Sequence, residues 1–463
     1  MFIKRKCLEK LEQWLKDEYR KPLVVYGARQ VGKTTLLRDI FAKEYFKTTI
    51  YIDFKVDKEE RVFIKNHVNA KDIVDYLSRK NNVNIDENTL IIFDEIQECL
   101  PCLTSLKYFC QDYRHVPVIA TGSMIRIKLK QIEYEERRIV LDKEIDKDHQ
   151  DGNNNYLFPT GKINKLNMFP ISFEEYLQAK NDIFYNFLFD SYKKKEVLDD
   201  EYHNLAMSYL YEYLSIGGMP EVVDIFLKTK SFNKARNTLE EIYSDYLADM
   251  SLYQISQETI MRTRNVFNNI YLQLNKDNKN FKISFIEANK RVRDYLYPLD
   301  WLSEGNIVFK SYCLKEIVHA PLSISDSSLF RIYFSDIGFF SYQSGLSGDK
   351  FLYDISRNDL AGIFFENFVA CQLSYRNQPL FYWKGKTSSE LEFLIDIDSS
   401  IIPIDAKKNK GTLDSIEKYR EHNKNDLAIK VSNNKYGYNN DKKLLTLPFY
   451  YFGFYLEEHL KQF

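Results

Sequence analysis

The 463-residue sequence has no excess of charge of either sign, because 65 Lys and Arg residues oppose 66 Asp and Glu residues, which leaves a formal net charge of −1. This balance argues against a protein that coats nucleic acid by bulk charge, although a local basic patch is compatible with it. No run of about 18 apolar residues occurs, so no transmembrane helix is predicted. Residues 1–21 carry charges throughout and lack the apolar stretch of a signal peptide. A cytoplasmic protein without a membrane partner is expected.

Cysteine is also scarce, with six residues scattered along the chain. Cys99 and Cys102 form a C-x-x-C pair, but no second pair and no His lies at the spacing of a zinc site. The sequence therefore predicts reduced structural thiols rather than a disulfide framework or a metal centre at these residues.

The length is sufficient for two to four domains. Short runs rich in Val, Ile, Tyr and Phe alternate with helical patterns at residues 23–26, 49–54, 90–93 and 116–120. This alternation predicts an α/β core with a parallel sheet covered by helices. A polar stretch over residues 126–164 reads as an exposed insertion, and a fifth strand is expected at residues 165–168.

Residues 27–34 match the phosphate-loop pattern G-x-x-x-x-G-K-[ST] and lie between a predicted strand and a predicted helix. Backbone N–H groups of such a loop point at phosphate oxygens. Lys33 is expected to neutralise the β- and γ-phosphates of ATP, and the Thr34 hydroxyl to bind Mg²⁺. The predicted nucleotide-binding residues are Gly27, Ala28, Arg29, Gln30, Val31, Gly32, Lys33, Thr34 and Thr35.

A second element of the nucleotide site follows the apolar run 90–93, which ends in Asp94 and Glu95. We expect Asp94 at the Mg²⁺ ion and Glu95 as the catalytic base that polarises water. Ser123 follows the next predicted strand and could sense the γ-phosphate, although a strand-terminating turn explains it equally well. The phosphate loop and the acidic strand end, in this order, predict an ATPase.

Several further motifs resemble a family of prokaryotic AAA-type ATPases with a C-terminal domain of uncertain function. They are the phosphate loop preceded by a basic helix with Arg5, and the motifs at residues 93–97, 120–123, 169–175, 217–221, 333–338 and 362–369. The resemblance implies an AAA-like core over residues 1–180, a helical lid over 181–257, a winged-helix-like domain over 258–345 and a restriction-endonuclease-like α/β domain over 346–463. The family has a Gly-Arg where this chain has Gly161-Lys162. Arg137 and Arg138 are other candidates, so no arginine finger is assigned and an oligomer stays open.

The C-terminal part contains a second candidate site. Asp405 and Lys407 end an apolar run and share one face of a predicted strand, since strand side chains alternate. Glu392 would come from the preceding strand of a hairpin that turns at residues 398–400, and Glu366 from a helix. Acidic groups that converge on a metal ion, with a nearby Lys, are typical of nucleases. Without the resemblance, solvated strand ends explain these residues equally well. With it, Glu392 and Asp405 become candidate metal ligands and Glu366, Glu392, Asp405 and Lys407 candidate catalytic residues.

A basic stretch at residues 287–295 follows an expected strand at 281–285. As the recognition helix of a winged helix it would offer Lys290, Arg291 and Arg293 to DNA. The alternative is a solvated helix face. Tyr295, Trp301 and Leu302 are expected in the core.

Two hypotheses follow. The first is an ATPase that acts on nucleic acid through a nuclease-like C-terminal domain. The second is a slow nucleotide-dependent switch or scaffold whose C-terminal domain only binds a partner protein.

Overall fold

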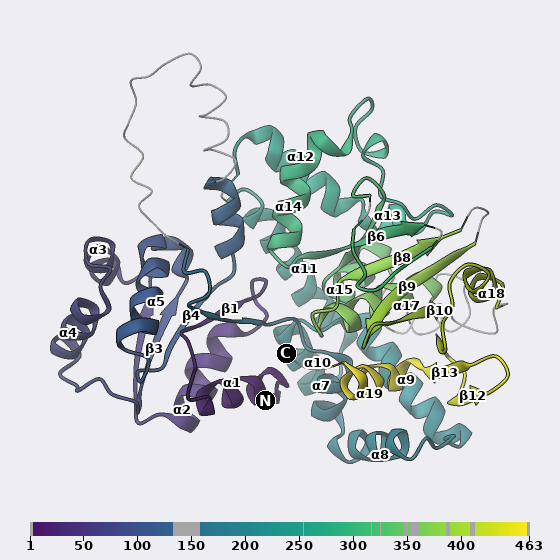
Figure 1. Cartoon of the computed structure of the whole chain (residues 1–463), viewed down its shortest axis with the longest axis horizontal. Coiled ribbons are helices and arrows are strands. Elements are labelled where there is room, and N and C mark those ends of the chain that lie inside the picture. Colours follow the sequence, from purple (N-terminus) through teal and green to yellow (C-terminus); the bar gives the residue numbers. More distant parts are fainter. Residues whose placement is uncertain are drawn as a thin grey trace. The chain divides into compact units, whose positions relative to one another are not determined.

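The chain is described by a computed structural model that covers residues 3–132, 158–252, 254–315, 317–324, 326–346, 348, 351, 361–385, 389–407 and 413–460. Arg137 and Arg138 lie outside these residues. The chain forms two compact units (Figure 1). The N-terminal unit comprises Arg5–Phe169 and Tyr253–Ile255, and the C-terminal unit comprises Met1–Lys4, Pro170–Leu252 and Ser256–Phe463. Within the described parts of the chain, no helix combines the length and the apolar character needed to cross a membrane.

The N-terminal unit is built on a five-stranded sheet in the order β2-β3-β4-β1-β5, in which every neighbouring pair is parallel. The strands are β1 Leu23–Tyr26, β2 Thr48–Asp53, β3 Thr89–Asp94, β4 Val118–Gly122 and β5 Asn164–Asn167. All residues of β1, β3 and β4 are buried, as expected for a parallel sheet covered on both faces. The predicted α/β core is confirmed.

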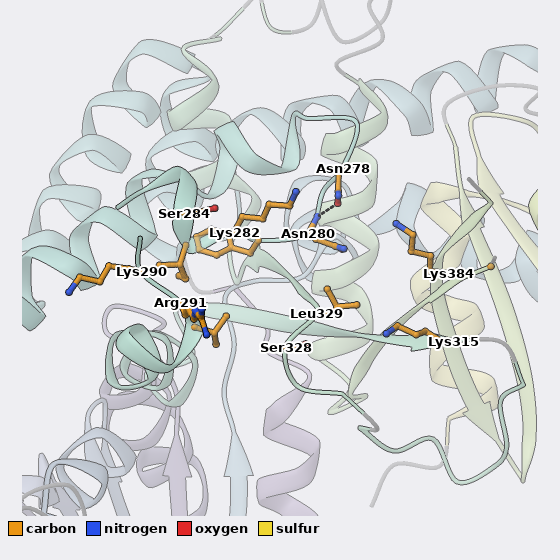
Figure 2. Close-up of a pocket in the computed structure, with 14 residues that line it drawn as sticks. Asn278, Asn280, Lys282, Ser284, Lys290, Arg291, Lys315, Ser328, Leu329 and Lys384 are labelled. Atoms are coloured by element: carbon orange, nitrogen blue, oxygen red, sulfur yellow. Dashed lines mark hydrogen bonds between the residues drawn. The ribbon is translucent and has the colours of Figure 1, made fainter. Parts of the chain in front are cut away.

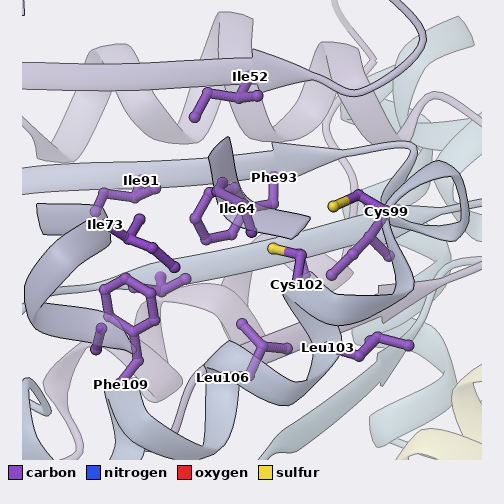
Figure 3. Packing of buried hydrophobic residues seen from close by; sticks show 14 of the residues in the cluster. Ile52, Ile64, Ile73, Ile91, Phe93, Cys99, Cys102, Leu103, Leu106 and Phe109 are labelled. Carbon is purple, nitrogen blue, oxygen red and sulfur yellow. The ribbon is translucent and has the colours of Figure 1, made fainter. Parts of the chain in front are cut away.

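The helices of this unit bury their apolar faces against the sheet. They are α1 Cys7–Lys16, a π-helical segment Thr35–Phe41, α2 Ala42–Tyr45, α3 Lys58–Asn66, α4 Ala70–Asn81 and α5 Leu100–Asp112. Figure 3 shows one such core, where Phe93 of β3 packs among Ile73 of α4 and Phe109 of α5. Cys99 and Cys102 lie inside it, and burial raises the pKa of the Cys99 thiol to about 11. Both are buried structural thiols, as the sequence predicts.

The C-terminal unit begins with a layer of helices and continues with a mixed sheet. The helices are α7 Phe173–Lys180, α8 Asp182–Lys193, α9 Asp200–Ile216, α10 Pro220–Thr229, α11 Phe232–Asp249, α12 Gln257–Asn268, α13 Ile270–Leu274, α14 Leu296–Glu304 and α15 Ile337–Ser344. Helix α7 starts with a capping box, in which Ser172 and Glu175 each bond to the other's backbone N–H.

Eight strands form the sheet of the C-terminal unit, in the order β12-β13-β11-β10-β9-β8-β6-β7. The strands are β6 Val308–Lys315, β7 Phe330–Phe334, β8 Leu380–Lys384, β9 Glu390–Ile397, β10 Ser400–Ala406, β11 Ala428–Ser432, β12 Gly437–Asn439 and β13 Leu444–Pro448. Helices α17 Ala361–Ser374, α18 Asp414–Arg420 and α19 Phe449–His459 accompany it. Strands β6 and β7, which the sequence assigns to a middle domain, pair with each other and continue this sheet through β8.

The expected strand at 281–285 and the recognition helix at 287–295 are both wrong. Residues Ile283–Phe285 and Val292–Tyr295 form short 3₁₀ helices separated by non-helical backbone. Asn289 lies between them with φ at 63°, a left-handed conformation that ends any helix. Tyr295, Trp301 and Leu302 are buried, as predicted.

Two glycine-containing motifs meet in the C-terminal unit. The Asp336 carboxylate accepts hydrogen bonds from the N–H groups of Gly218 and Gly338, both at 2.7 Å. A Cβ on Gly217 would lie 2.2 Å from Asp336 Oδ1, and Gly217 has φ at 77°. Glycine is therefore required at the end of α9, and the contact connects α9 to the start of α15.

Candidate functional site

The phosphate loop follows β1 directly, and its conformation depends on backbone that most residues avoid. Gly32 has φ at 91° and Gln30 has φ at 62°. A Cβ on Gly27 would come within 2.3 Å of the Met168 carbonyl oxygen, so the loop lies tightly against the chain after β5. Arg5 donates hydrogen bonds to the carbonyls of Val31 and Phe169 at 3.0 and 2.6 Å. These bonds connect the phosphate loop to the chain that follows β5. Arg5 precedes α1 rather than lying in it.

Lys33 is buried at the centre of this loop and is held by its backbone. Its ammonium donates hydrogen bonds to the carbonyls of Gly27 at 2.9 Å and Ala28 at 2.7 Å. Burial lowers the pKa of Lys33 to about 8, although the charges of Glu95 and Asp94 act in the opposite direction. A bound triphosphate would add negative charge beside the Lys33 ammonium and raise its pKa.

Thr34 and Asp94 come together as predicted for a shared Mg²⁺ site. The Thr34 hydroxyl donates a hydrogen bond to Asp94 Oδ2 at 2.7 Å. Tyr51 of β2 donates a second one to the same oxygen at 2.8 Å, while Asp94 Oδ1 accepts from the Glu95 N–H at 2.9 Å. A hydroxyl and a carboxylate oxygen at this distance fit the ligands that Mg²⁺ prefers. No local pattern marks Tyr51, because only the pairing of β2 with β3 brings it to Asp94.

Glu95 has φ at 52° and its carboxylate contacts two neighbours. Gln97 donates a hydrogen bond to Glu95 Oε2, and Lys55 Nζ lies 3.1 Å from the same atom. These two contacts hold the Glu95 carboxylate in one orientation.

Ser123 stands just past the end of β4, which lies between β1 and β3 in the sheet. Its hydroxyl is buried and finds no hydrogen-bond partner among the described residues. A buried polar group without a partner is costly. The position between the phosphate loop and Asp94 therefore fits a group that bonds to a phosphate oxygen.

Arg126 was not considered in the sequence analysis. Its guanidinium lies 4.4 Å from the ring centre of Tyr26 and donates a hydrogen bond to Asn167 Oδ1 at 3.1 Å. Both contacts place it at the ends of β1 and β5, beside the phosphate loop.

The second candidate site begins with the hairpin of β9 and β10, which turns at Asp398 and Ser399 with φ at 49° and 65°. The antiparallel register pairs Ile404 with Phe393. Continued by one residue, it places Asp405 opposite Glu392, and opposed residues of antiparallel strands point to the same face. The predicted hairpin is confirmed, and Glu392 and Asp405 are hereafter the carboxylate pair.

Both members of the carboxylate pair have oxygens without partners. Glu392 Oε2 and Asp405 Oδ2 are shielded from solvent and accept no hydrogen bond from the described residues. Lys407 Nζ forms an ion pair with Asp405 Oδ1 at 2.8 Å. Burial, and then the charge of Asp405, raise the pKa of Glu392. Two adjacent carboxylates that each keep one oxygen without a donor fit a divalent cation.

Both carboxylate oxygens of Glu366 in α17 are bound by neighbouring side chains. It forms ion pairs with Lys279 and with Arg331 Nη1, the latter at 3.2 Å, and accepts a hydrogen bond from the Tyr333 hydroxyl at 2.6 Å. Burial alone would raise the pKa of Glu366, but the charges of Lys279 and Arg331 outweigh it and lower that pKa. Over the described parts of the chain, no group of three or more His, Cys, Asp or Glu side chains is arranged to hold a metal. A metal site here would therefore depend on the carboxylate pair.

Lys279 and Arg331 are residues of this site that the sequence pattern does not reveal. They lie far from Glu366 in sequence, and no local pattern marks them. Arg331 also forms an ion pair with Glu390, and its guanidinium lies 4.1 Å from the ring centre of Tyr382.

Three family models match parts of the chain. The model described as an AAA domain matches residues 19–145, and two domains of unknown function, DUF8612 and DUF4143, match residues 207–350 and 361–450. The first match supports a P-loop ATPase of the AAA type in the N-terminal unit. Two similar proteins are the uncharacterized proteins MJ1544 and MJ1637 of Methanocaldococcus jannaschii, each 24% identical. The matches cover 80% of this chain and 71% of MJ1544, and 66% of this chain and 59% of MJ1637.

Proposed function

We propose that this chain is an ATP-dependent protein that cleaves nucleic acid, with Mg-ATP at the phosphate loop and a divalent cation at the carboxylate pair. The buried, partnerless oxygens of Glu392 and Asp405 carry this proposal. They favour a bound cation over a merely structural arrangement, because buried carboxylate oxygens otherwise find donors.

At the phosphate loop, Lys33 would neutralise the β- and γ-phosphates, and Thr34 and Asp94 would hold Mg²⁺. Glu95, oriented by Gln97 and Lys55, would position and deprotonate the attacking water. The Ser123 hydroxyl would donate its hydrogen bond to the γ-phosphate.

At the carboxylate pair, a divalent cation would supply Lewis acidity and a nucleophilic water. Glu392 and Asp405 would bind it, and the Lys407 ammonium would stabilise the charge that grows on the scissile phosphate. Burial alone would lower the pKa of Lys407, but the carboxylates of Glu392 and Asp405 outweigh it and raise that pKa. Lys407 therefore remains a cation at neutral pH.

The test is cleavage of plasmid and linear DNA and of RNA in Mg²⁺ or Mn²⁺, with and without ATP. We expect wild type to cut, and Glu392→Gln and Lys407→Ala each to reduce the rate at least 100-fold, the scale of loss of an electrostatic catalytic group. Asp396→Asn, which removes a carboxylate from the same strand outside the pair, serves as the control with near wild-type activity. Equal rates for wild type and both variants, or no cleavage of any substrate, would refute a nuclease.

A nucleotide-dependent switch or scaffold is a second candidate, and the closed ion pairs of Glu366 favour it. A site used only for structure would keep all its acidic groups paired. In that case ATP would be bound and slowly hydrolysed, while Glu392→Gln would leave partner binding intact. If wild type cleaves nucleic acid and Glu392→Gln does not, the chain is a nuclease and not only a switch or scaffold.

A further inference from the structure

A cavity of about 640 Å³ lies in the C-terminal unit and is lined by basic side chains (Figure 2). Its five cationic residues are Lys282, Lys290, Arg291, Lys315 and Lys384. The lining residues, all of them described, include no Asp and no Glu. This basic cavity offers several positive charges to one ligand, which favours a polyanion over a single small anion.

Three of the lining cations form ion pairs with acidic residues that do not line the cavity. The pairs are Lys290 with Glu287 at 3.9 Å, Lys315 with Asp326 at 3.5 Å and Lys384 with Glu390 at 3.3 Å. Such half-exposed ion pairs contribute little energy, so phosphate groups can compete for the same cations.

The basic cavity is lined in part by Lys384 of β8, and β8 pairs with β9, the strand that carries Glu392. Asn278 and Asn280 also line the cavity, while Lys279 between them reaches Glu366. Lys384 of the wall pairs across the ladder with Glu390, and strand alternation places Glu390 and Glu392 on one face. A backbone held in the cavity would therefore lie on the side of the sheet that presents the carboxylate pair.

An exposed aromatic ring stands beside the cavity. Phe285 is 49% exposed, although it directly follows the lining residue Ser284. The amines of Lys276 and Lys282 lie 3.4 and 5.4 Å from its ring centre. Aromatic rings among cations are the platforms on which unpaired bases stack, whereas the bases of a duplex are not accessible to them.

We propose that the basic cavity binds the phosphate backbone of a single-stranded nucleic acid and that Phe285 stacks on one of its bases. This inference rests on the proposed function in one respect, since it names the substrate that the carboxylate pair would receive. The cations fix the backbone without reading sequence, and binding should therefore tolerate any base order.

The experiment measures the binding of a fluorescein-labelled single-stranded oligonucleotide and of the matching duplex to the full chain by anisotropy, in EDTA so that no cleavage occurs. We expect the single strand to bind more tightly than the duplex. If three to five phosphates are neutralised, its affinity should fall roughly 20- to 100-fold between 50 and 200 mM salt. Phe285→Ala should weaken single-strand binding roughly 5- to 100-fold and leave duplex binding unchanged.

Lys282→Ala/Arg291→Ala should weaken binding at least tenfold. The matched control is Lys234→Ala/Arg79→Ala, which removes the same two charge types from exposed residues outside the cavity. Equal weakening in both double variants, or a duplex bound as tightly as the single strand, would overturn the proposal. Because binding is read in EDTA, a chain that binds but never cuts would refute the nuclease and leave this inference standing.

Discussion

At the scale of single residues, each candidate site holds an ionisable group whose pKa is shifted mainly by burial. Burial lowers the pKa of Lys33 in the phosphate loop and raises the pKa of Glu392 in the C-terminal sheet. Each shift disfavours the charged form, and each would be reversed by a ligand of opposite sign. Phosphate would do so for Lys33 and a divalent cation for Glu392.

Nucleotide affinity should fall in alkaline solution because of Lys33. Because the pKa of Lys33 is about 8 without nucleotide, above pH 8 the neutral amine must take up a proton to bind ATP. By linkage, the dissociation constant of Mg-ATP should rise about tenfold between pH 7 and pH 9. Titration of the protein with a fluorescent ATP analogue at several pH values measures this dissociation constant. Lys33→Ala should bind at least 100-fold more weakly at every pH, and Lys43→Ala, an exposed helix residue, should match wild type. A flat profile in wild type would contradict the assignment.

Glu392 should make the metal-free protein less stable as the pH rises. The pKa of Glu392 is higher in the folded protein than in the unfolded chain. The stability that the protonated Glu392 contributes is therefore fully present below the unfolded-state pKa of about 4.5, and it is lost as the pH rises through the folded-state pKa. Glu392→Gln removes the ionisation and should stabilise the metal-free chain at pH 8 by about 1–2 kcal/mol, since one unit of pKa is worth about 1.4 kcal/mol. Urea unfolding of wild type and Glu392→Gln at pH 5 and pH 8 tests this. A variant less stable than wild type at pH 8 would contradict it.

At the scale of elements, the sequence predicted those strands and turns whose position depends on the local pattern of apolar and turn residues. The strands of the N-terminal sheet and the β9–β10 hairpin each have an apolar run bounded by turn residues, and such signals survive without tertiary context. The carboxylate pair followed from strand alternation. The prediction of a strand and a helix over residues 281–295 was wrong because tertiary contacts override the local sequence pattern there. Glu287 bonds to Arg262 and to the Tyr295 hydroxyl, and no periodicity in the sequence reveals those partners.

The junction between α9 and α15 should depend on glycine. In Gly217→Ala the new methyl group would meet Asp336 Oδ1, and the positive φ adds backbone strain. We expect a loss of roughly 2–4 kcal/mol in the free energy of unfolding. Gly362→Ala is the control, because it lies in helix α17 with open space around its Cβ and should be neutral or stabilising by up to about 1 kcal/mol. Chemical unfolding that gave the two variants equal stability would argue against the proposed strain.

At the scale of the whole molecule, the two candidate sites lie in different compact units. Separate family models match the two parts, an AAA domain over residues 19–145 and a domain of unknown function over residues 361–450. Under the proposed function, ATP hydrolysis in one unit would control cleavage in the other. Each unit should nevertheless bind its own metal ion, since the ligands of each site come from within that unit.

Counting bound Mn²⁺ by electron paramagnetic resonance tests the central claim most directly. Without nucleotide, wild type should bind one Mn²⁺ ion, and a non-hydrolysable ATP analogue should add a second at Thr34 and Asp94. Glu392→Gln/Asp405→Asn should lose only the nucleotide-independent ion, and Lys33→Ala only the nucleotide-dependent one. A wild-type chain that binds no Mn²⁺ without nucleotide, or one whose ion survives in Glu392→Gln/Asp405→Asn, would contradict a metal site at the carboxylate pair.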